Sequence, residues 1–301
     1  MNQTIVFLLT TLAVTGRTDA GPSVDSDRGT GRPVVSITGN MFLIDGQPTY
    51  KGRHWQGNRI EGLLLNARLV QGIFDDENPE TRSLFKYPDT GKWDADRNTD
   101  EFVAAMPLWQ AHGLNSFTIN LQGGSPTGYG NRNWKNTAFS KDGSLKPAYF
   151  DRLTRILDQA EKLKMIPIMG FFYFGQDQNL KDESAVIRAV DNATGWLLDK
   201  GYRNVLVEIN NETNVRAYDH DILKPGRVHE LINRVKGKRG EGYRLLVSTS
   251  FGGRYIPDAK IAEVSDFILI HGNGVKDPAY IKEMVVRTKA LDTYRGQPIV
   301  F

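Results

Sequence analysis

The sequence of 301 residues contains no cysteine. Scaffolds held by disulfides, zinc sites with thiolate ligands and enzymes with a cysteine nucleophile are therefore excluded. This absence leaves the redox compartment open, because a chain of this length can bury a core that needs no disulfide. Apolar residues make up 40% of the chain and charged residues 24%, which is typical of a globular protein and not of a disordered one.

The chain has little excess of charge of either sign. Its 38 lysines and arginines stand against 35 aspartates and glutamates, so the formal net charge is +3. So small an excess, spread along the chain, argues against a protein that binds nucleic acid. Glycine-rich phosphate loops of the G-x-G-x-x-G and Walker types are also lacking, which weakens any nucleotide-binding reading. We expect no cofactor.

Long apolar runs are scarce, and only residues 5–14 resemble a targeting segment. The run has the length of a signal-peptide core, and Thr18-Asp19-Ala20 offers a small-residue cleavage site. We therefore expect a signal peptide over residues 1–20, a flexible leader over 21–33 and a secreted or periplasmic protein. No lysine or arginine precedes the run, so an N-terminal helix or a mistaken start site are the alternatives. No segment is long and apolar enough to span a membrane.

Ordered structure is expected from residue 34 onward. Residues 34–50 alternate apolar with polar positions around Asp45-Gly46, which predicts a β-hairpin. After it, strand-like runs alternate with amphipathic helical patterns, and residues 57–100 predict a long loop insertion with little helix. The expected strands are 50–55, 115–121, 166–172, 204–210, 244–250, 266–271 and 297–301. The expected helices are 98–109, 149–164, 184–200, 228–236, 257–264 and 278–291.

Such strict alternation favours a parallel sheet with helical crossovers, either doubly wound or closed into a barrel. The missing glycine loops count against nucleotide-binding doubly wound sheets, and a closed eight-stranded barrel needs about 250 residues. The sequence therefore predicts an α/β fold, a (β/α)8 TIM barrel over residues 34–301 with an N-terminal β-hairpin. The sequence ends after the seventh expected strand of this barrel.

Functional side chains of parallel barrels lie at the C-terminal ends of the strands. Here these ends carry amide, hydroxyl and imidazole groups together with aromatic rings, the mixture that suits the hydroxyls and flat faces of sugars. The candidate substrate-binding residues read from these ends are His54, Trp55, Asn120, Gln122, Tyr173, Asn211, Ser250, His271 and Asn273. His54 and His271 are equally compatible with structural roles, and Trp55 and Tyr173 with core or lid positions.

The fourth expected strand, residues 204–210, is followed by Asn211-Glu212. In this feature the sequence resembles the retaining glycoside hydrolases with a (β/α)8 barrel, the superfamily of cellulases, β-mannanases and β-galactosidases, and within it glycoside hydrolase family 5. The likeness extends to the hairpin at 42–48 and to His271, and covers about residues 35–301. It implies a carbohydrate substrate, Glu212 as the general acid/base and Asn211 as a ligand of the sugar 2-hydroxyl. Without the resemblance, Glu212 would be an ordinary helix-entry residue capped by Asn211.

The resemblance also implies a second carboxylate, a nucleophilic glutamate at the end of strand seven. The chain stops at Phe301, inside that strand, so we expect the nucleophile one or a few residues beyond it. Two alternatives are a truncated, inactive homologue and a substitute carboxylate, for which Glu61, Asp75 and Asp177 are candidates. An arginine that supports the nucleophile in many relatives is also lacking from the second strand, which has Thr118 and Asn120 instead.

Further charged residues have weaker readings. Glu208 is expected inside the barrel, and Arg53 is a candidate to pair with it or to support the nucleophile. Residues 94–100 alternate oxygen ligands as a calcium loop does, but they lack its glycine and closing glutamate, so a helix-capping loop and no metal site are expected.

Two other function classes stay open beside the hydrolase. One is a carbohydrate-binding pseudoenzyme on the same barrel, which uses its cleft without cleavage. The other is an unrelated barrel enzyme such as an aldolase or isomerase. That class needs a lysine or metal ligands at strand ends, and no lysine occurs at the six readable ends.

Overall fold

The computed structural model describes residues 31–126 and 133–301. Contacts divide the chain into two units, Met1–Gly31 and Arg32–Phe301. The second unit begins two residues earlier than expected, because Pro33 is buried and Arg32 pairs with Glu161 at 3.8 Å. The expected signal peptide, and the leader up to residue 30, lie outside the described residues and stay predictions.

The N-terminal hairpin is present. Strands β1 (Val35–Thr38), β2 (Met41–Ile44) and β3 (Gln47–Pro48) form an antiparallel sheet in that order. Asp45 and Gly46 both have positive φ, 52° and 72°, as a two-residue type I′ turn requires. The hairpin expected from the sequence is thereby confirmed.

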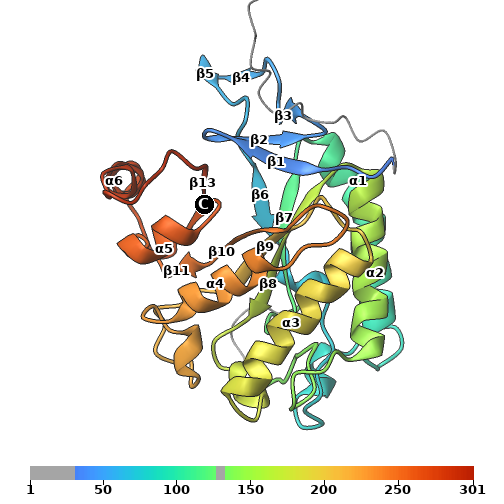
Figure 1. The fold of residues 1–301 in the computed structure, drawn as a ribbon. Coiled ribbons are helices and arrows are strands. Elements are labelled where there is room, and N and C mark those ends of the chain that lie inside the picture. Colours follow the sequence, from blue (N-terminus) through green and yellow to red (C-terminus); the bar gives the residue numbers. More distant parts are fainter. Residues whose placement is uncertain (1–30, 127–132) are drawn as a thin grey trace, which may run out of the picture. The chain divides into compact units, whose positions relative to one another are not determined.

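A series of parallel strands forms the centre of the fold (Figure 1). One sheet runs in the order β10, β9, β8, β7, β6, and another in the order β11, β12, β13. Only Thr249 separates β10 from β11, so the two sheets share one interrupted strand and the described residues provide seven parallel strands. The strands are β6 (Asn66–Arg68), β7 (Ser116–Asn120), β8 (Ile166–Phe172), β9 (Leu206–Asn210), β10 (Leu246–Ser248), β11 (Ser250–Phe251), β12 (Ile268–Ile270) and β13 (Ile299–Val300).

The first parallel strand is not where the sequence placed it. Tyr50 and Gly52 adopt left-handed conformations, with φ of 50° and 70°, which an extended strand does not allow. The chain instead forms a small antiparallel hairpin of β4 (His54–Trp55) and β5 (Asn58–Arg59). β6 then lies within the stretch expected to be a loop, together with short 3₁₀ turns at Val70–Gly72 and Arg82–Phe85.

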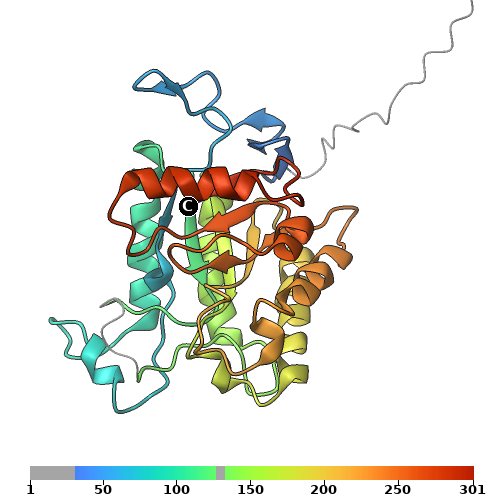
Figure 2. The same ribbon diagram turned by 90° about the vertical axis from the view of Figure 1, so that its left-hand side faces the viewer.

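The helices follow the strands as expected, and α1 to α4 lie around the outside of the sheet (Figures 1 and 2). Asp94 caps the first helix by accepting a hydrogen bond from the Arg97 amide, so the alternating oxygens near it serve a helix start. No group of His, Asp and Glu able to hold a metal ion occurs within residues 31–126 and 133–301. The helices are α1 (Ala95–Ala111), α2 (Pro147–Lys162), α3 (Glu183–Asp199), α4 (Val228–Gly237), α5 (Ala259–Val264) and α6 (Pro278–Lys289).

The side chains inside the strand series change from apolar to polar along the strands. Near the N-terminal ends, Ile168, Leu206 and Leu269 form a buried cluster that Phe42 of the hairpin closes. Two residues further along β9, on the same face, lies Glu208, 1% exposed. The polar layer therefore faces the C-terminal ends of the strands, where a site is expected.

β6 and β13 are the two outer strands of the series. The Asn66 side chain donates a hydrogen bond of 2.8 Å to the carbonyl of Phe301, the last residue. The mixed α/β fold with a parallel central sheet is confirmed, whereas the expected stop before an eighth strand stays a prediction. In the part of the chain that the structure covers, helices are too short or too polar to cross a bilayer.

We predict that Phe42→Ala destabilises the fold by about 3–5 kcal/mol, because it opens a cavity among Phe267, Leu206 and Val300 beneath the strands. The free energy of unfolding from urea titration measures the loss. Leu108→Ala on the exposed face of α1 is the control, with an expected change below about 0.5 kcal/mol. Equal effects of the two substitutions would contradict a closing role for the hairpin.

Candidate functional site

A pocket of about 820 Å³ opens at the C-terminal ends of the strands. Its size lies within the range of small-molecule clefts. Residues from both ends of the strand series and from the loops after β7, β8, β9 and β12 contribute to it. The lining residues are Asn66, Arg68, Thr118, Gly123, Trp134, Tyr173, Phe174, Gly175, Gln176, Asn211, Glu212, Val215, Ala217, His271, Gly272, Asn273 and Phe301.

Five of the residues named from the sequence meet in this pocket. Tyr173 follows β8, Asn211 and Glu212 follow β9, and His271 and Asn273 follow β12. They meet because the strands are parallel and their C-terminal ends lie at the same edge of the sheet.

Three more of the named residues lie beneath or behind the pocket surface. Asn120 and Ser250 are fully buried in the polar layer inside the strands. Gln122 is buried as well, and its amide donates to the Thr137 hydroxyl at 3.0 Å. None of the three is among the lining residues. The sequence placed these residues correctly at strand ends. However, side chains at a strand end can also point into the buried layer beneath the pocket.

His54 and Trp55 lie far from the pocket, which corrects the expectation for both. They belong to the β4–β5 hairpin, which lies beside the N-terminal hairpin at the top of Figure 1, whereas the loops that follow β6 lie at the bottom. Trp55 is 63% exposed. The mistake followed from the first strand: with β6 in that position, its C-terminal end brings Arg68 into the site instead.

The loop after β12 holds the carboxylate of Glu212. Its Oε1 accepts hydrogen bonds from His271 Nδ1, at 2.9 Å, and from the Asn273 amide. Its Oε2 has no hydrogen-bond partner in the described part of the chain, and the residue is only 8% exposed. The loop after β11 approaches the loop after β12 closely at Gly253, where a Cβ would lie 1.9 Å from the Asn273 carbonyl oxygen. This approach requires glycine at position 253.

Asn211 lies in a turn after β9 and not at a helix start. Its backbone donates to the Phe172 carbonyl at 3.0 Å, and its carbonyl accepts from the Tyr218 hydroxyl at 2.6 Å. Burial raises the pKa of Tyr218 well above its ordinary value, so that the phenol stays a proton donor. Asn211 is 2% exposed, and among the residues that the structure describes its side-chain Oδ1 has no hydrogen-bond partner.

Arg68 was not found from the sequence. It ends β6, lines the pocket, and its guanidinium lies 5.8 Å from the centre of the Tyr173 ring. The alternation of Leu64, Asn66 and Arg68 on one face is the signal that could have revealed it. Arg53 was the wrong candidate for an interior cation, because it is exposed near the start of the β4–β5 hairpin.

Trp134 is the second residue that sequence reasoning missed, since it comes from a loop and not from a strand end. Gln176 holds its segment in place: Nε2 donates to the Trp134 carbonyl at 3.0 Å, and Oε1 accepts from the Asn136 amide at 3.1 Å. The ring packs with Phe74 and Phe85.

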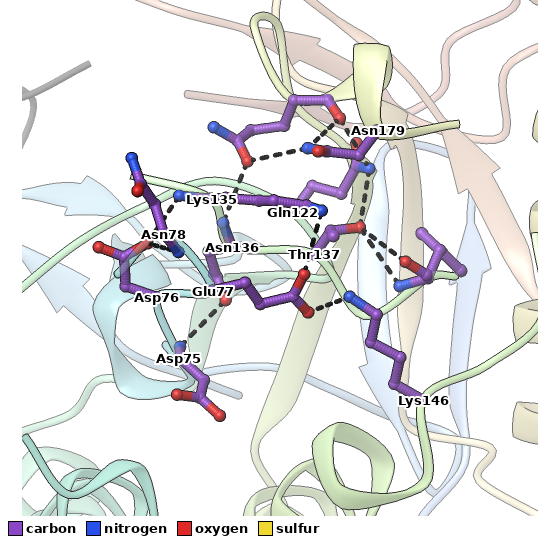
Figure 3. Close-up of polar contacts among 12 residues, drawn as sticks. Asp75, Asp76, Glu77, Asn78, Gln122, Lys135, Asn136, Thr137, Lys146 and Asn179 are labelled. Atoms are coloured by element: carbon purple, nitrogen blue, oxygen red, sulfur yellow. Dashed lines mark hydrogen bonds and ion pairs between the residues drawn. The ribbon is translucent and has the colours of Figure 1, made fainter. Parts of the chain in front are cut away.

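The segment around Trp134 is tied to the loop after β6 by a polar network (Figure 3). Asp76 accepts from the Lys135 backbone at 2.8 Å, Asn136 accepts from the Asp75 backbone at 3.1 Å, and Glu77 pairs with Lys135 and Lys146. The network gives the aromatic wall of the pocket a fixed position.

The substitute carboxylates considered from the sequence do not reach the pocket. Asp177 is buried and accepts from the backbone amides of Asp219 and His220 at 2.9 and 3.2 Å, and burial raises its pKa. Neither Asp177 nor Asp75 nor Glu61 is among the lining residues. In the described chain, the pocket is lined by a single carboxylate, Glu212.

Comparisons with known proteins give structural matches alone. No protein-family model matches the chain, and a search of curated proteins finds no match. A family 5 glycoside hydrolase, a mannosidase from Rhizomucor miehei, matches with a TM-score of 0.53 and 14% identity over 91% of this chain and 73% of that one. A family 5 glycoside hydrolase from Prevotella bryantii B14 matches with a TM-score of 0.52 and 10% identity over 78% and 74%.

A putative glycoside hydrolase from Bacteroides vulgatus matches with a TM-score of 0.52 and 13% identity over 92% of this chain and 48% of its own. The chain spans about half the length of the first solved structures it matches. At these identities the matches establish the fold: the chain is folded like glycoside hydrolase family 5 enzymes. The resemblance in fold expected from the sequence is confirmed.

We predict that Gln176→Leu releases Trp134 from the pocket wall. The substitution leaves the Trp134 carbonyl and the Asn136 amide without partners, which costs about 1–3 kcal/mol in stability. Quenching of tryptophan fluorescence by acrylamide should rise, and the rise should vanish in a Trp134→Phe background. Gln178→Leu, which removes an exposed amide bonded to the Ala217 carbonyl, is the matched control. Unchanged quenching in Gln176→Leu would show that other contacts position the ring.

Proposed function

We propose that the chain is the acid/base-bearing part of a retaining glycoside hydrolase that cleaves O-glycosidic bonds of a poly- or oligosaccharide. The observation that carries the proposal is Glu212: a buried carboxyl group at the end of the fourth parallel strand, held in the pocket with one oxygen unoccupied. The fold shared with family 5 hydrolases supports it.

The contacts of Glu212 give its two carboxylate oxygens different roles. Two donors occupy Oε1, so the proton of the acid form belongs on Oε2, which has no partner in the described chain. From Oε2 the proton passes to the glycosidic oxygen as the bond to the sugar carbon breaks. The resulting carboxylate then takes a proton from the water that attacks the glycosyl intermediate.

The walls of the pocket suit a sugar. Asn211 lines the pocket, so its side-chain amide is placed to bond a sugar hydroxyl beside the scissile bond. Trp134 and Tyr173 provide aromatic faces for the C–H surface of a ring. Neither feature selects a particular sugar or linkage.

The nucleophile is proposed to be a glutamate just beyond Phe301. Phe301 directly follows β13 and lines the same pocket as Glu212, so the next residues of a longer chain would continue into it. A retaining mechanism requires the two carboxyl groups to be about 5–5.5 Å apart. Arg68 in the same pocket would favour the ionised form of such a nucleophile.

A carbohydrate-binding pseudoenzyme is the second candidate. The observation in its favour is that Glu212 is the one carboxylate among the pocket residues of the described chain. The coding sequence after codon 301 separates the two: a glutamate within the next few residues supports the hydrolase, and a stop codon supports the pseudoenzyme.

We predict that the 301-residue chain shows no turnover of aryl glycosides above background, whereas a chain extended through an eighth strand is active. In the extended chain, Glu212→Gln should lower kcat/KM about 10²–10⁴-fold on glycosides with poor leaving groups. The loss should be smaller with good leaving groups, because they need less protonation. Azide should partly restore turnover of these substrates and give a glycosyl azide, since the small anion needs no general base.

Glu283→Gln, on the exposed face of α6, is the control and should leave the kinetics unchanged. Full activity of the 301-residue chain would refute the placing of the nucleophile. Full activity of extended Glu212→Gln on poor leaving groups would refute the acid/base role.

A further inference from the structure

The backbone of Glu212 has an unfavourable conformation that something must hold. Its φ is 52°, in the left-handed region where a residue with a Cβ is strained and glycine is favoured. The turn brings Glu212 from the end of β9 into the pocket, where its carboxylate reaches His271 and Asn273.

Ser250 lies beneath this turn and binds two successive amides. Its hydroxyl oxygen accepts from the Glu212 backbone amide at 2.8 Å, and its carbonyl accepts from the Thr213 amide at 2.9 Å. The hydroxyl proton is donated to Oε1 of Glu208. Because the hydroxyl has a single proton, the Glu208 acceptor directs that proton away from Glu212 and leaves a lone pair for the Glu212 amide.

The neighbouring strands, and not contacts in the pocket, determine the position of Glu208. It pairs in register with Gly170 of β8 on one side and with Ser248 of β10 on the other, and is 1% exposed. Gly170 leaves room for the neighbouring buried Asn120, since a Cβ there would lie 2.3 Å from Asn120 Oδ1, and the same Cβ would be in van der Waals contact with Glu208 Oε2 at 3.4 Å. Glu208 is not among the residues that line the pocket.

We propose that Glu208 and Ser250 are positioning residues that hold the left-handed backbone of Glu212 and thereby aim its Oε2 at the substrate. The inference rests on the proposed function for its catalytic consequence, whereas the conformational part stands on the hydrogen bonds alone. Ser250 of β11 holds the backbone of Glu212, and the loop after β12 holds its carboxylate.

The first experiment tests the conformation in the 301-residue chain and needs no activity. Glu212→Gly and Glu212→Ala both remove the carboxylate, but only alanine is strained at φ of 52°. With Ser250 present, the glycine variant should unfold at a higher urea concentration than the alanine variant. With Ser250→Ala added, residue 212 can relax, and the order should reverse, because alanine is otherwise the more stable of the two.

The same order in both backgrounds would overturn the proposal that Ser250 holds the strained turn. This result would leave the acid/base role of Glu212 untouched, since the urea midpoints do not depend on catalysis.

The second experiment measures kinetics in the extended chain. Ser250→Ala should lower kcat/KM about tenfold to a hundredfold on glycosides with poor leaving groups, with less loss on good ones and partial rescue by azide. These are the signatures of a displaced acid/base. Glu208→Leu should behave in the same way.

Glu208→Gln should retain more activity than Glu208→Leu, because the amide oxygen still accepts from the Ser250 hydroxyl. Thr249→Val is the matched control: it removes a buried hydroxyl one residue from Ser250 that bonds to Asn210 and not to Glu212.

In the Thr249→Val control, kcat/KM should change by the same factor for glycosides with good and with poor leaving groups, and azide should have no effect. If Ser250→Ala lowers kcat/KM equally for good and poor leaving groups and azide gives no rescue, Ser250 and Glu208 have a structural role only. If Glu212→Gln itself lacks the leaving-group dependence, the proposed function fails and the conformational result of the urea experiment still stands.

Discussion

The alternation of side chains along the parallel strands is the constraint on which the site depends. Every second residue points inside, so one strand such as β9 carries an apolar residue, Leu206, at one end and a carboxylate, Glu208, two positions later. The apolar end is closed by Phe42 from the hairpin. This arrangement places apolar packing at the N-terminal ends of the strands and polar groups toward their C-terminal ends. The pocket opens beyond this polar layer.

Buried polar groups beneath the pocket are expensive unless they bond to one another. Ser250 satisfies Glu208 and the Glu212 amide together, and this pairing links two strands and one turn. The left-handed conformation of Glu212 is local strain that the hydrogen bonds around it offset. A strained residue at the centre of a pocket is typical of a functional position.

The pocket walls have a different origin from its floor. The floor consists of strand ends, but the aromatic wall is built by a loop in which Gln176 and Asn136 bind the backbone around Trp134. Contacts of this kind join segments about forty residues apart, and no local pattern of apolar residues encodes them. This is why Trp134 escaped the sequence argument. Arg68 escaped it for another reason, because the first parallel strand was placed at the wrong residues.

The sequence by itself determined the order of strands and helices after residue 95, the N-terminal hairpin and the position of Asn211-Glu212 at a strand end, because periodicity and turn residues are local signals. It did not determine the first parallel strand. Residues 50–55 and 66–68 are both short, and only pairing with β7 decides between them. Tertiary structure also decided which strand-end side chains face the pocket and which are buried one layer below. The depth of a side chain depends on neighbouring strands, which a single segment does not specify.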